Sequence, residues 1–416
     1  MEWLTDLPPK LGTINVPSLL SVTRLATSGS CNLKAIVPTA LCPIWPPSPE
    51  VEFGRLSHSL MDLAAKGQIQ STALGDARPV EEALDRLLQN EKITLARSPS
   101  TRDYADLRVA FSQREWRRRT SLAVDRTLEL LRSPLTTADN RQPTRQSKST
   151  PLERALRIEG FAASEVTVES KNLRLQGRVD FLRVSEDSVV EISDFKSGKV
   201  LNDEGEVDEV TSLQLRLYGL GILDLVPGAR LQLKVVSRGG ISNVNFSPEE
   251  IERTKEWLAQ RLLPLRENQL IEANEIAVVG PQCRGCRARA VCPKYRTSVG
   301  ELWKRQDVTM RLPLDIAGQI LEVEPSGGAA TTIKLTDLAG RVVKIHRLRP
   351  IVLPTSFDKS VFWFFNLATS EVPLQNGKWR HPRNFHELPA SALERRAWTI
   401  KAYRDPTPSQ EKDTSC

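Results

Sequence analysis

Three consecutive stretches of the chain alternate between apolar and other side chains, and they constrain the fold more than any other feature. They span about 164–170, 173–185 and 188–196. A period of two is typical of half-buried β-strands, and short connections place such strands side by side in one sheet. We therefore predict a strand meander at the centre of the chain, which an all-helical protein does not contain.

Charged residues lie on the last two predicted strands. The sequence GRVD ends at Asp180, and EISDFKSGK places Asp194 and Lys196 directly after an apolar run. Side chains two apart on a strand share a face, so Asp194 and Lys196 point the same way and Asp180 lies beside them on the neighbouring strand. Adjacent carboxylates repel unless a cation joins them, and oxygen ligands suit Mg²⁺ or Mn²⁺. A nearby lysine can orient or activate water and offset charge on a phosphate.

Two further short motifs lie on predicted helices. Gln214 and Tyr218 are four residues apart within a helix predicted over about 209–225, so they share one face. Upstream, GRLSH ends at His58 on a helix whose leucines recur at helical spacing. The sequences GRLSH, GRVD, EISDFKSGK and QLRLY, in that order, resemble the motifs of the RecB-like branch of the PD-(D/E)xK nucleases.

The resemblance implies both a fold and the roles of the motif residues. The fold is α/β, with an α+β restriction-endonuclease-like core, a helical N-terminal part and a helical insertion over about 78–150, where a single helix is predicted from about 103 to 132. The expected metal ligands, for Mg²⁺ or Mn²⁺, are His58, Asp180, Asp194 and the carbonyl of Phe195. Lys196 is then the catalytic lysine, and Gln214 and Tyr218 support the site or the substrate strand.

Three of the six cysteines lie close together, in a C-x2-C-x5-C pattern at Cys283, Cys286 and Cys292. The N-terminus has no basic stretch before an apolar core, so we expect a cytoplasmic protein without structural disulfides. No apolar run approaches the length of a membrane span, so no membrane partner is expected. Three neighbouring thiolates then indicate a metal site, and their spacing leaves zinc and iron–sulfur open.

The chain also resembles the subset of RecB-like nucleases that carries a 4Fe-4S cluster, represented by AddB-type helicase-nuclease subunits and the four-cysteine nucleases of CRISPR adaptation. In that subset the first cysteine lies far upstream, which here implies Cys31 as the fourth ligand. Cys31 is followed by Asn where the subset has Pro. Cys42 does precede a proline and is the alternative, whereas Cys416 lies near the end of the chain and is expected to be a free thiol.

The C-terminal part has the texture of a small all-β domain. Apolar strands are predicted near 315–323, 330–336, 341–347 and 360–367. We predict a nuclease domain over 1–300, an OB-like β-barrel over 301–402 and a polar tail over 403–416. Such barrels stack single-stranded bases on aromatic rings, and Trp363 and Trp379 are the candidates here. Alternation requires about half of the aromatic residues at 362–365 to face inward, and an SH3-like barrel that binds protein is the alternative.

Local clusters of charge, and not the net charge, indicate the class of partner. The 58 Lys plus Arg residues exceed the 51 Asp plus Glu by seven, a mild excess for this length. Arginines cluster near Arg117 and Arg118 and again near Arg284 and Arg287, where they can contact a DNA backbone. The 40% hydrophobic content excludes a largely disordered chain.

The function predicted from these observations is metal-dependent hydrolysis of phosphodiester bonds in DNA. The resemblance implies an exonuclease on single-stranded DNA, acting in DNA repair and recombination or in antiviral defence. No G-x-x-x-x-G-K-[ST] sequence occurs, so the chain is not itself a helicase, although a helicase or another repair or defence subunit is an expected partner. The alternative is a catalytically inactive scaffold subunit of such a complex that binds nucleic acid.

Overall fold

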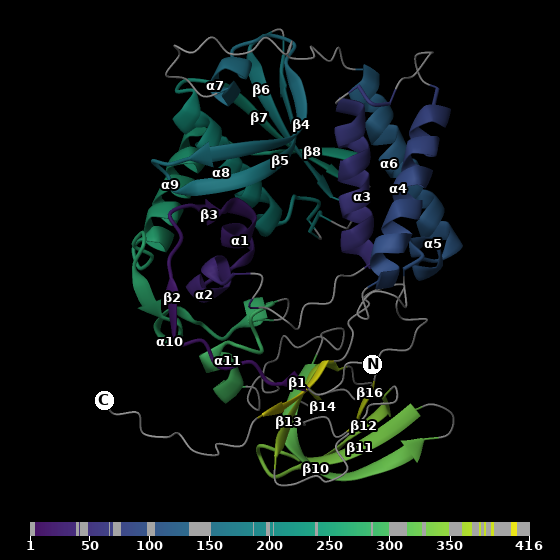
Figure 1. Ribbon diagram of the computed structural model, residues 1–416. Helices are drawn as coiled ribbons and strands as arrows, with labels where there is room; N and C mark the ends of the chain where they lie inside the picture. The colour runs from purple at the N-terminus through teal and green to yellow at the C-terminus, as the bar shows by residue number, and fades with distance from the viewer. Residues whose placement is uncertain are drawn as a thin grey trace.

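The protein forms a mixed α/β core and a separate antiparallel sheet in a computed structural model (Figure 1). The residues that the structure describes are 5–38, 41, 49–65, 67–69, 76–97, 105–132, 151–185, 187–196, 200–202, 204–237, 240–283, 286–298, 314–326, 330–348, 360–367, 374–375, 378–379, 384–386 and 401–405. The alternative ligand Cys42, the expected free thiol Cys416 and the arginine at 284 lie outside these residues.

The predicted meander forms the centre of a mixed sheet. Its strands are β3 (Leu20–Ser21), β4 (Ala162–Ser170), β5 (Leu175–Val184), β6 (Val189–Lys196), β7 (Arg230–Ser237) and β8 (Gly240–Val244). The strands β4, β5 and β6 pair antiparallel, which confirms the meander. The pairs β6–β7 and β3–β5 are parallel, so the sheet is mixed.

Helices cover both faces of this sheet (Figure 1). On one face lie α8 (Glu209–Leu225) and α9 (Pro248–Leu262), and on the other lie α3 (Pro49–Ala65), α4 (Arg78–Arg97) and α6 (Gln113–Arg132). The Ser247 hydroxyl caps α9 by accepting the Glu250 amide, as serine does at helix starts. The helix predicted over 209–225 is confirmed as α8.

The sheet separates two hydrophobic cores. The larger core contains apolar residues of the sheet, such as Leu182 and Ile192, together with Leu215 of α8. The smaller core joins α3, α4 and α6, and only Ala162 and Phe181 of the sheet strands are among its fully buried members. Because apolar burial drives both cores, the sheet end that carries the charged motifs is held between two packed layers.

The single helix predicted over 103–132 is wrong. The structure has α5 (Leu107–Ala110), an extended Phe111, and then α6 from Gln113. The Ser112 hydroxyl accepts the Glu115 amide at 3.2 Å, which starts a new helix. Ser followed three residues later by Glu is the signature of a capping box, a local signal that outweighs the continuous apolar spacing.

The N-terminal segment packs beside the region that follows α9. It contains β2 (Thr13–Asn15), α1 (Val22–Thr27) and α2 (Asn32–Ile36), and the later region contains β9 (Leu270–Glu272), α10 (Ala273–Ile276), a 3-10 turn at Pro281–Cys283 and α11 (Pro293–Ser298). Strands β2 and β9 pair antiparallel. Segments about 250 residues apart in sequence therefore lie side by side (Figure 1).

The four predicted C-terminal strands are confirmed. They are β10 (Leu314–Ser326), β11 (Ala330–Asp337), β12 (Val342–Leu348) and β13 (Val361–Leu367), paired antiparallel. At the edges lie β16 (Asn384–His386), β17 (Lys401–Asp405) and β1 (Thr5–Asp6). Among the described strands, none pairs β1 with β16 to close a barrel. The tail boundary at 403 is wrong, because β17 extends to Asp405.

The aromatic strand β13 is covered on both faces, whereas alternation predicted that about half of its rings face inward. Phe362, Trp363, Phe364 and Phe365 are all at most 3% exposed. Trp363 stacks on Phe365 at 5.9 Å, and both belong to the larger core that also contains residues of the mixed sheet. The predicted base-stacking role of Trp363 is therefore wrong for this structure, since no ring face is open to solvent. The side chain of Trp379, in the short pair β14–β15 (Leu374–Gln375 and Lys378–Trp379), lies outside the described part.

None of the described helices is both long enough and apolar enough to cross a bilayer.

Candidate active site

The side-chain alternation of β4 and β5 slips by one residue at the same level of the sheet. Ala163 and Val166 both pack against the larger core although they are three residues apart, and Val179 and Leu182 do the same on β5. An uninterrupted strand sends residues three apart to opposite faces. On β4 the slip occurs at Glu165, which has a φ of 54°, a left-handed conformation that is uncommon for glutamate.

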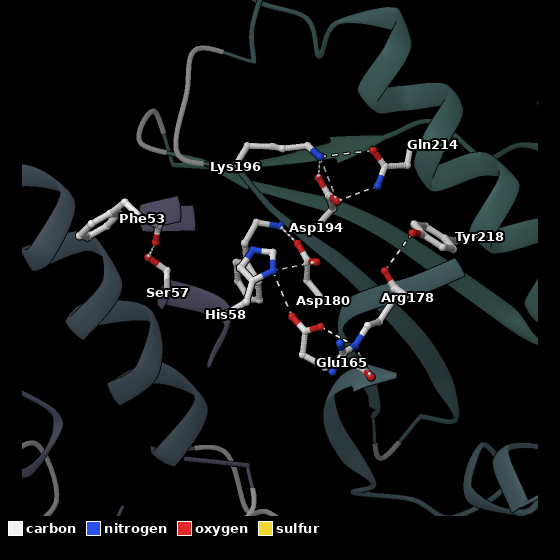
Figure 2. A network of polar contacts seen from close by, with 11 residues as sticks. Phe53, Ser57, His58, Glu165, Arg178, Asp180, Asp194, Lys196, Gln214 and Tyr218 are labelled. Atoms are coloured by element: carbon white, nitrogen blue, oxygen red, sulfur yellow. Dashed lines mark hydrogen bonds and ion pairs between the residues drawn. The ribbon is translucent and has the colours of Figure 1, made fainter. Parts of the chain in front are cut away.

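The slip turns two carboxylates toward α3. The Nδ1 of His58 lies 3.0 Å from Glu165 Oε1 and 3.5 Å from Asp180 Oδ1 (Figure 2). Ligand atoms of these three residues lie within 4.8 Å of one another, and in the described part of the chain they form the one such group of His, Cys, Asp and Glu. An imidazole with two carboxylates is a donor set that suits a divalent cation.

Glu165 is the site residue that the sequence motifs did not indicate. It lies on the first strand of the meander, between Ser164 and Val166, which pair with residues on either side of Asp180. Its second oxygen, Oε2, forms an ion pair with Arg178 Nε at 2.6 Å, and the same Nε donates to the Glu165 carbonyl at 3.2 Å. The sequence did show a glutamate on the strand next to GRVD. Regular strand alternation, however, gave no reason to place its side chain beside His58.

A second polar group lies on the α8 side of the sheet. Lys196 Nζ is 2.9 Å from Asp194 Oδ2 and 3.3 Å from Gln214 Oε1 (Figure 2). The Gln214 amide nitrogen donates to Asp194 Oδ1 at 3.2 Å. Each of the three side chains therefore contacts the other two, and the amide holds the ends of both charged groups in place.

Asp180 joins the two groups. Its Oδ2 accepts the Phe195 backbone amide at 2.7 Å, so the carboxylate is fixed to the strand that carries Asp194 and Lys196. Burial, together with the charge of Asp194, raises the pKa of Asp180 to about 7. Neighbouring buried carboxylates favour a proton or a cation between them, because either one relieves the repulsion.

The amine and the imidazole respond to the same carboxylates. Burial lowers the pKa of Lys196, but the charge and hydrogen bond of Asp194 outweigh it, so the pKa is raised overall. Burial likewise lowers the pKa of His58, and the hydrogen bond to Glu165 with the charge of Asp180 raises it above 6.5. Lys196 is therefore held as a cation, and His58 is an imidazole for which a proton and a metal ion compete.

Tyr218 supports the strand and does not reach the carboxylates with its hydroxyl. Its Oη donates to the Arg178 carbonyl at 2.9 Å. The ring lies so close to Gly177 that a Cβ there would be 2.5 Å from Tyr218 Cε1. The glycine of GRVD and the tyrosine of QLRLY are therefore complementary in shape, since only a residue without Cβ leaves room for the ring.

The expected metal-ligand set is brought together in part. His58 and Asp180 lie in one group with Glu165, while Asp194 is engaged by Lys196 and Gln214, and Phe195 uses its amide on Asp180. The residues fit a divalent cation because the donors are an imidazole and carboxylates, and because the buried acidic pair lacks enough positive charge to keep both members ionised.

Four buried cysteines lie in the second candidate site. They are Cys31, Cys283, Cys286 and Cys292. Burial raises the pKa of Cys283 to about 11 and of Cys292 to about 12, and each of these two thiols also feels the charge of Cys31 and Cys286. Val278 contacts both cysteine-bearing segments, because its amide donates to Cys31 Sγ at 3.5 Å and its carbonyl accepts from Cys283 Sγ at 3.9 Å.

Cationic side chains surround these thiols. Lys34 Nζ donates to the carbonyls of Thr27 at 2.6 Å and Gln282 at 3.1 Å, so it ties the two cysteine-bearing segments together. Burial lowers the pKa of Lys34, and the charges of Cys286 and Cys283 oppose that shift. Arg289 is 2% exposed and donates to the Cys283 carbonyl at 3.3 Å. Positive charge therefore faces a group of potential thiolates.

The predicted DNA-contacting arginines lie in different settings. Arg117 is exposed and Arg118 half-buried, and with Gln113 and Arg114 they line an open recess of about 510 Å³ on α6. Arg287 is exposed, on the turn that carries the cysteines. Guanidinium groups at an open recess are suited to phosphate.

Comparisons with known proteins identify a family for this chain. The family model described as the PD-(D/E)XK nuclease superfamily matches residues 19–293, which include both candidate sites. A solved structure described as "Crystal structure of SSO0001" is similar at 16% sequence identity over 45% of this chain and 84% of that chain, with a TM-score of 0.20. None of the curated proteins matches the chain. The match over residues 19–293 covers more than half of the sequence, and the chain belongs to the PD-(D/E)XK nuclease superfamily.

Proposed function

We propose that the protein is a metal-dependent deoxyribonuclease of the RecB-like branch, which hydrolyses phosphodiester bonds. The observation that carries this proposal is the convergence of His58, Glu165 and Asp180 with the Asp194–Lys196–Gln214 group at one end of the sheet. Membership of the superfamily implies a phosphodiester hydrolase and makes a divalent cation plausible. A scaffold without activity has no need for a buried acidic pair beside a lysine cation.

The residues of the chain have separable roles in this reaction. His58, Glu165, Asp180 and Asp194 would hold the cation, which when bound polarises the scissile phosphate and lowers the pKa of a water nucleophile. Lys196 places a fixed positive charge where negative charge develops in the transition state. Gln214 orients the lysine and the aspartate, and Tyr218 fixes the GRVD strand through the Arg178 carbonyl.

The cysteine site is proposed to hold a 4Fe-4S cluster, with Cys31, Cys283, Cys286 and Cys292 as ligands. Amides at Gly280 and Tyr295 donate to Cys283 and Cys292 at 3.4 and 3.5 Å, as amides do around cluster sulfurs. Four sulfurs around one zinc ion would lie about 3.8 Å apart for Zn–S bonds of about 2.3 Å. Among the described cysteines no three sulfurs lie within 4.8 Å of one another, and metal analysis distinguishes a zinc ion from the proposed cluster.

The substrate is proposed to be DNA, with single-stranded DNA and exonucleolytic cleavage as the finer expectation. The arginines of the α6 recess supply contacts for the phosphate backbone. Trp363 is buried and cannot stack on bases. The preference for single-stranded DNA therefore rests only on the resemblance to the RecB-like branch. The proposed domains are a nuclease domain over about 1–300 and an OB-like domain over about 301–402. The proposed partner is a helicase, in repair or defence.

End-labelled DNA in the presence of Mg²⁺ or Mn²⁺ tests the activity. Purified protein is expected to degrade linear single strands and to spare circular ones, and Asp194→Asn is expected to abolish cleavage. Asp187→Asn is the matched control, because Asp187 is an exposed aspartate just before the same strand. Binding without cleavage of any DNA by the wild-type protein would support the inactive scaffold instead.

Metal analysis of anaerobically purified protein tests the cysteine site. Iron with acid-labile sulfide and broad visible absorbance are expected, and Cys31→Ser should lose them. Cys42→Ser should retain the iron, the sulfide and the absorbance, because the proposal assigns the fourth ligand to Cys31 and not to Cys42. A colourless protein loaded with zinc contradicts the cluster and leaves the nuclease proposal standing.

A further inference from the structure

Arg126 reaches from the helical layer to the end of the strand that carries the lysine. It lies on α6 and is 6% exposed. Its Nη2 donates to the Lys196 carbonyl at 3.2 Å and to the Val236 carbonyl at 2.9 Å. The guanidinium also lies over the Phe195 ring, 5.3 Å from its centroid. None of the sequence motifs includes this residue.

The two carbonyls belong to the ends of adjacent strands. Lys196 is the last residue of β6 and pairs with Ser237, the last residue of β7, and Val236 precedes that serine. Strand ends are the places where local opening is easiest. A planar guanidinium bonded to both strands resists that opening, because separation of the strands breaks at least one charge-assisted hydrogen bond.

We propose that Arg126 is a positioning residue that fixes the backbone of Lys196, and so the place of its amine beside Asp194 and Gln214. This inference rests on the proposed nuclease function. Arg126 bonds the backbone of Lys196 and stacks on its neighbour, and it is almost fully buried, so it acts on the reaction through the lysine. The helical layer thereby contributes to catalysis without supplying a motif residue.

Arg119 provides a matched comparison on the same helix. Its side chain is 11% exposed, its Nε pairs with Glu115 at 2.9 Å, and its guanidinium lies over Phe111 at 4.6 Å. These partners belong to the helical layer, whereas the described partners of Arg126 (Lys196, Val236 and Phe195) belong to the sheet. Loss of either guanidinium removes a buried charge and an aromatic contact, so effects on folding alone should be similar for both.

Single-turnover cleavage of single-stranded DNA separates the two arginines. Arg126→Met is expected to lower the rate by about 10²-fold, the size of effect that a misplacement of about 1 Å produces, with the DNA dissociation constant unchanged. Arg126→Lys should recover part of the rate, because an ammonium can still donate to a carbonyl. Arg119→Met should retain the rate. Equal losses in the two methionine variants would overturn the proposal.

A double-mutant cycle asks whether Arg126 acts through the lysine. If it does, Arg126→Met combined with Lys196→Ala cleaves no more slowly than Lys196→Ala alone, because the positioned group is already gone. A general structural defect would multiply the two losses, and that result contradicts a positioning role.

Amide hydrogen exchange on the metal-free protein gives a readout that does not need activity. Exchange at residues 193–196 and 234–237 is expected to be faster in Arg126→Met and unchanged in Arg119→Met. Unchanged exchange in Arg126→Met overturns the proposal. A wild-type protein that cuts no DNA, but whose strand ends open on loss of Arg126, refutes the nuclease function and retains the structural half of the inference.

Discussion

Two ion pairs with nearly equal distances lie in very different surroundings. Lys196 and Asp194 are 2.9 Å apart with side chains 30% and 6% exposed, while Arg289 and Asp315 are 2.8 Å apart with side chains 2% and 0% exposed. Tyr295 adds a 2.6 Å hydrogen bond to Asp315. Asp315 lies on β10, so the second pair joins the cysteine segment to the C-terminal sheet.

The difference shows how burial assigns a charge to chemistry or to structure. A pair that is partly open to solvent can exchange partners at modest free-energy cost, which is what a site for a cation and a phosphate needs. A pair without solvent access cannot be separated without leaving an uncompensated charge in the interior. The first pair is therefore expected to control the reaction rate and the second the stability, and four predictions examine that division.

The largest effect is expected on cleavage by Lys196→Ala. Loss of the amine should lower the rate by about 10²–10³-fold, because a preorganised charge at the developing anion is removed. The free energy of unfolding should fall less than on loss of Asp315, since the amine is partly solvated and Asp194 keeps Gln214 as a partner. Single-turnover rates and urea denaturation measure the two quantities. A large loss of stability with an unchanged rate would reverse the assignment.

Asp315→Ala is expected to have the opposite profile. It leaves Arg289 buried without its carboxylate, which should lower the free energy of unfolding by about 3–5 kcal/mol. Cleavage per folded molecule should stay near that of the wild type. The control is Asp85→Ala, whose carboxylate is 69% exposed and pairs with Arg108, where a loss below about 1 kcal/mol is expected. Equal losses in both variants would contradict the role of burial.

Gly177→Ala is expected to cost about 1–3 kcal/mol of stability, because the new Cβ meets the Tyr218 ring at 2.5 Å. Cleavage should fall with it, since the ring supports the strand of Asp180. Gly54→Ala is the control glycine: it lies in α3, and the position of an added Cβ has nothing within 4 Å, so alanine should stabilise the helix by about 0.5–1 kcal/mol. Thermal denaturation of both variants shows whether a loss of stability comes from the contact with the Tyr218 ring or from replacing any glycine by alanine.

The smallest effect is expected from pH on the metal-free protein. The pKa of Asp180 is about 7 in the fold against an ordinary value of 3.8, so its protonated form is favoured by folding. The corresponding stability is fully present below about pH 4 and is lost as the pH rises through about 7. Asp180→Asn should flatten this part of the profile, as urea denaturation across the pH range would show. Metal affinity should fall about tenfold per pH unit below 7, because binding releases the proton.

Local rules account for much of the fold and for most of the site. Periodicity located β4, β5, β6 and α8, because these elements form from neighbouring residues. The motif residues His58, Asp180, Asp194, Lys196 and Gln214 all lie at one end of the sheet, as the expected meander requires. The resemblance to a nuclease family supplied what periodicity alone could not, namely which helix faces the strands.

Non-local contacts explain the rest. Glu165 was missed because its positive φ shifts the alternation, and periodicity assumes regular strands. Trp363 was placed on a binding surface because four successive aromatic residues do not reveal that both faces of a strand are covered. Arg126 and Arg289 each act on elements far away in the sequence, at Lys196 and at Asp315, and no local pattern marks such partners.

The pairing of β1 with β17 bears on the order in which the molecule can be completed during synthesis. Thr5 pairs with Tyr403, and Leu20 pairs with Leu175, so early residues wait for partners made much later. At about 5–20 residues per second, Tyr403 is made some tens of seconds after Thr5, so these two residues can pair only then. Cys31 Sγ likewise accepts from the amide of Val278, a residue that is made much later. Strand β1 is thus expected to remain without its β17 partner until residues 403 and 404 have been made.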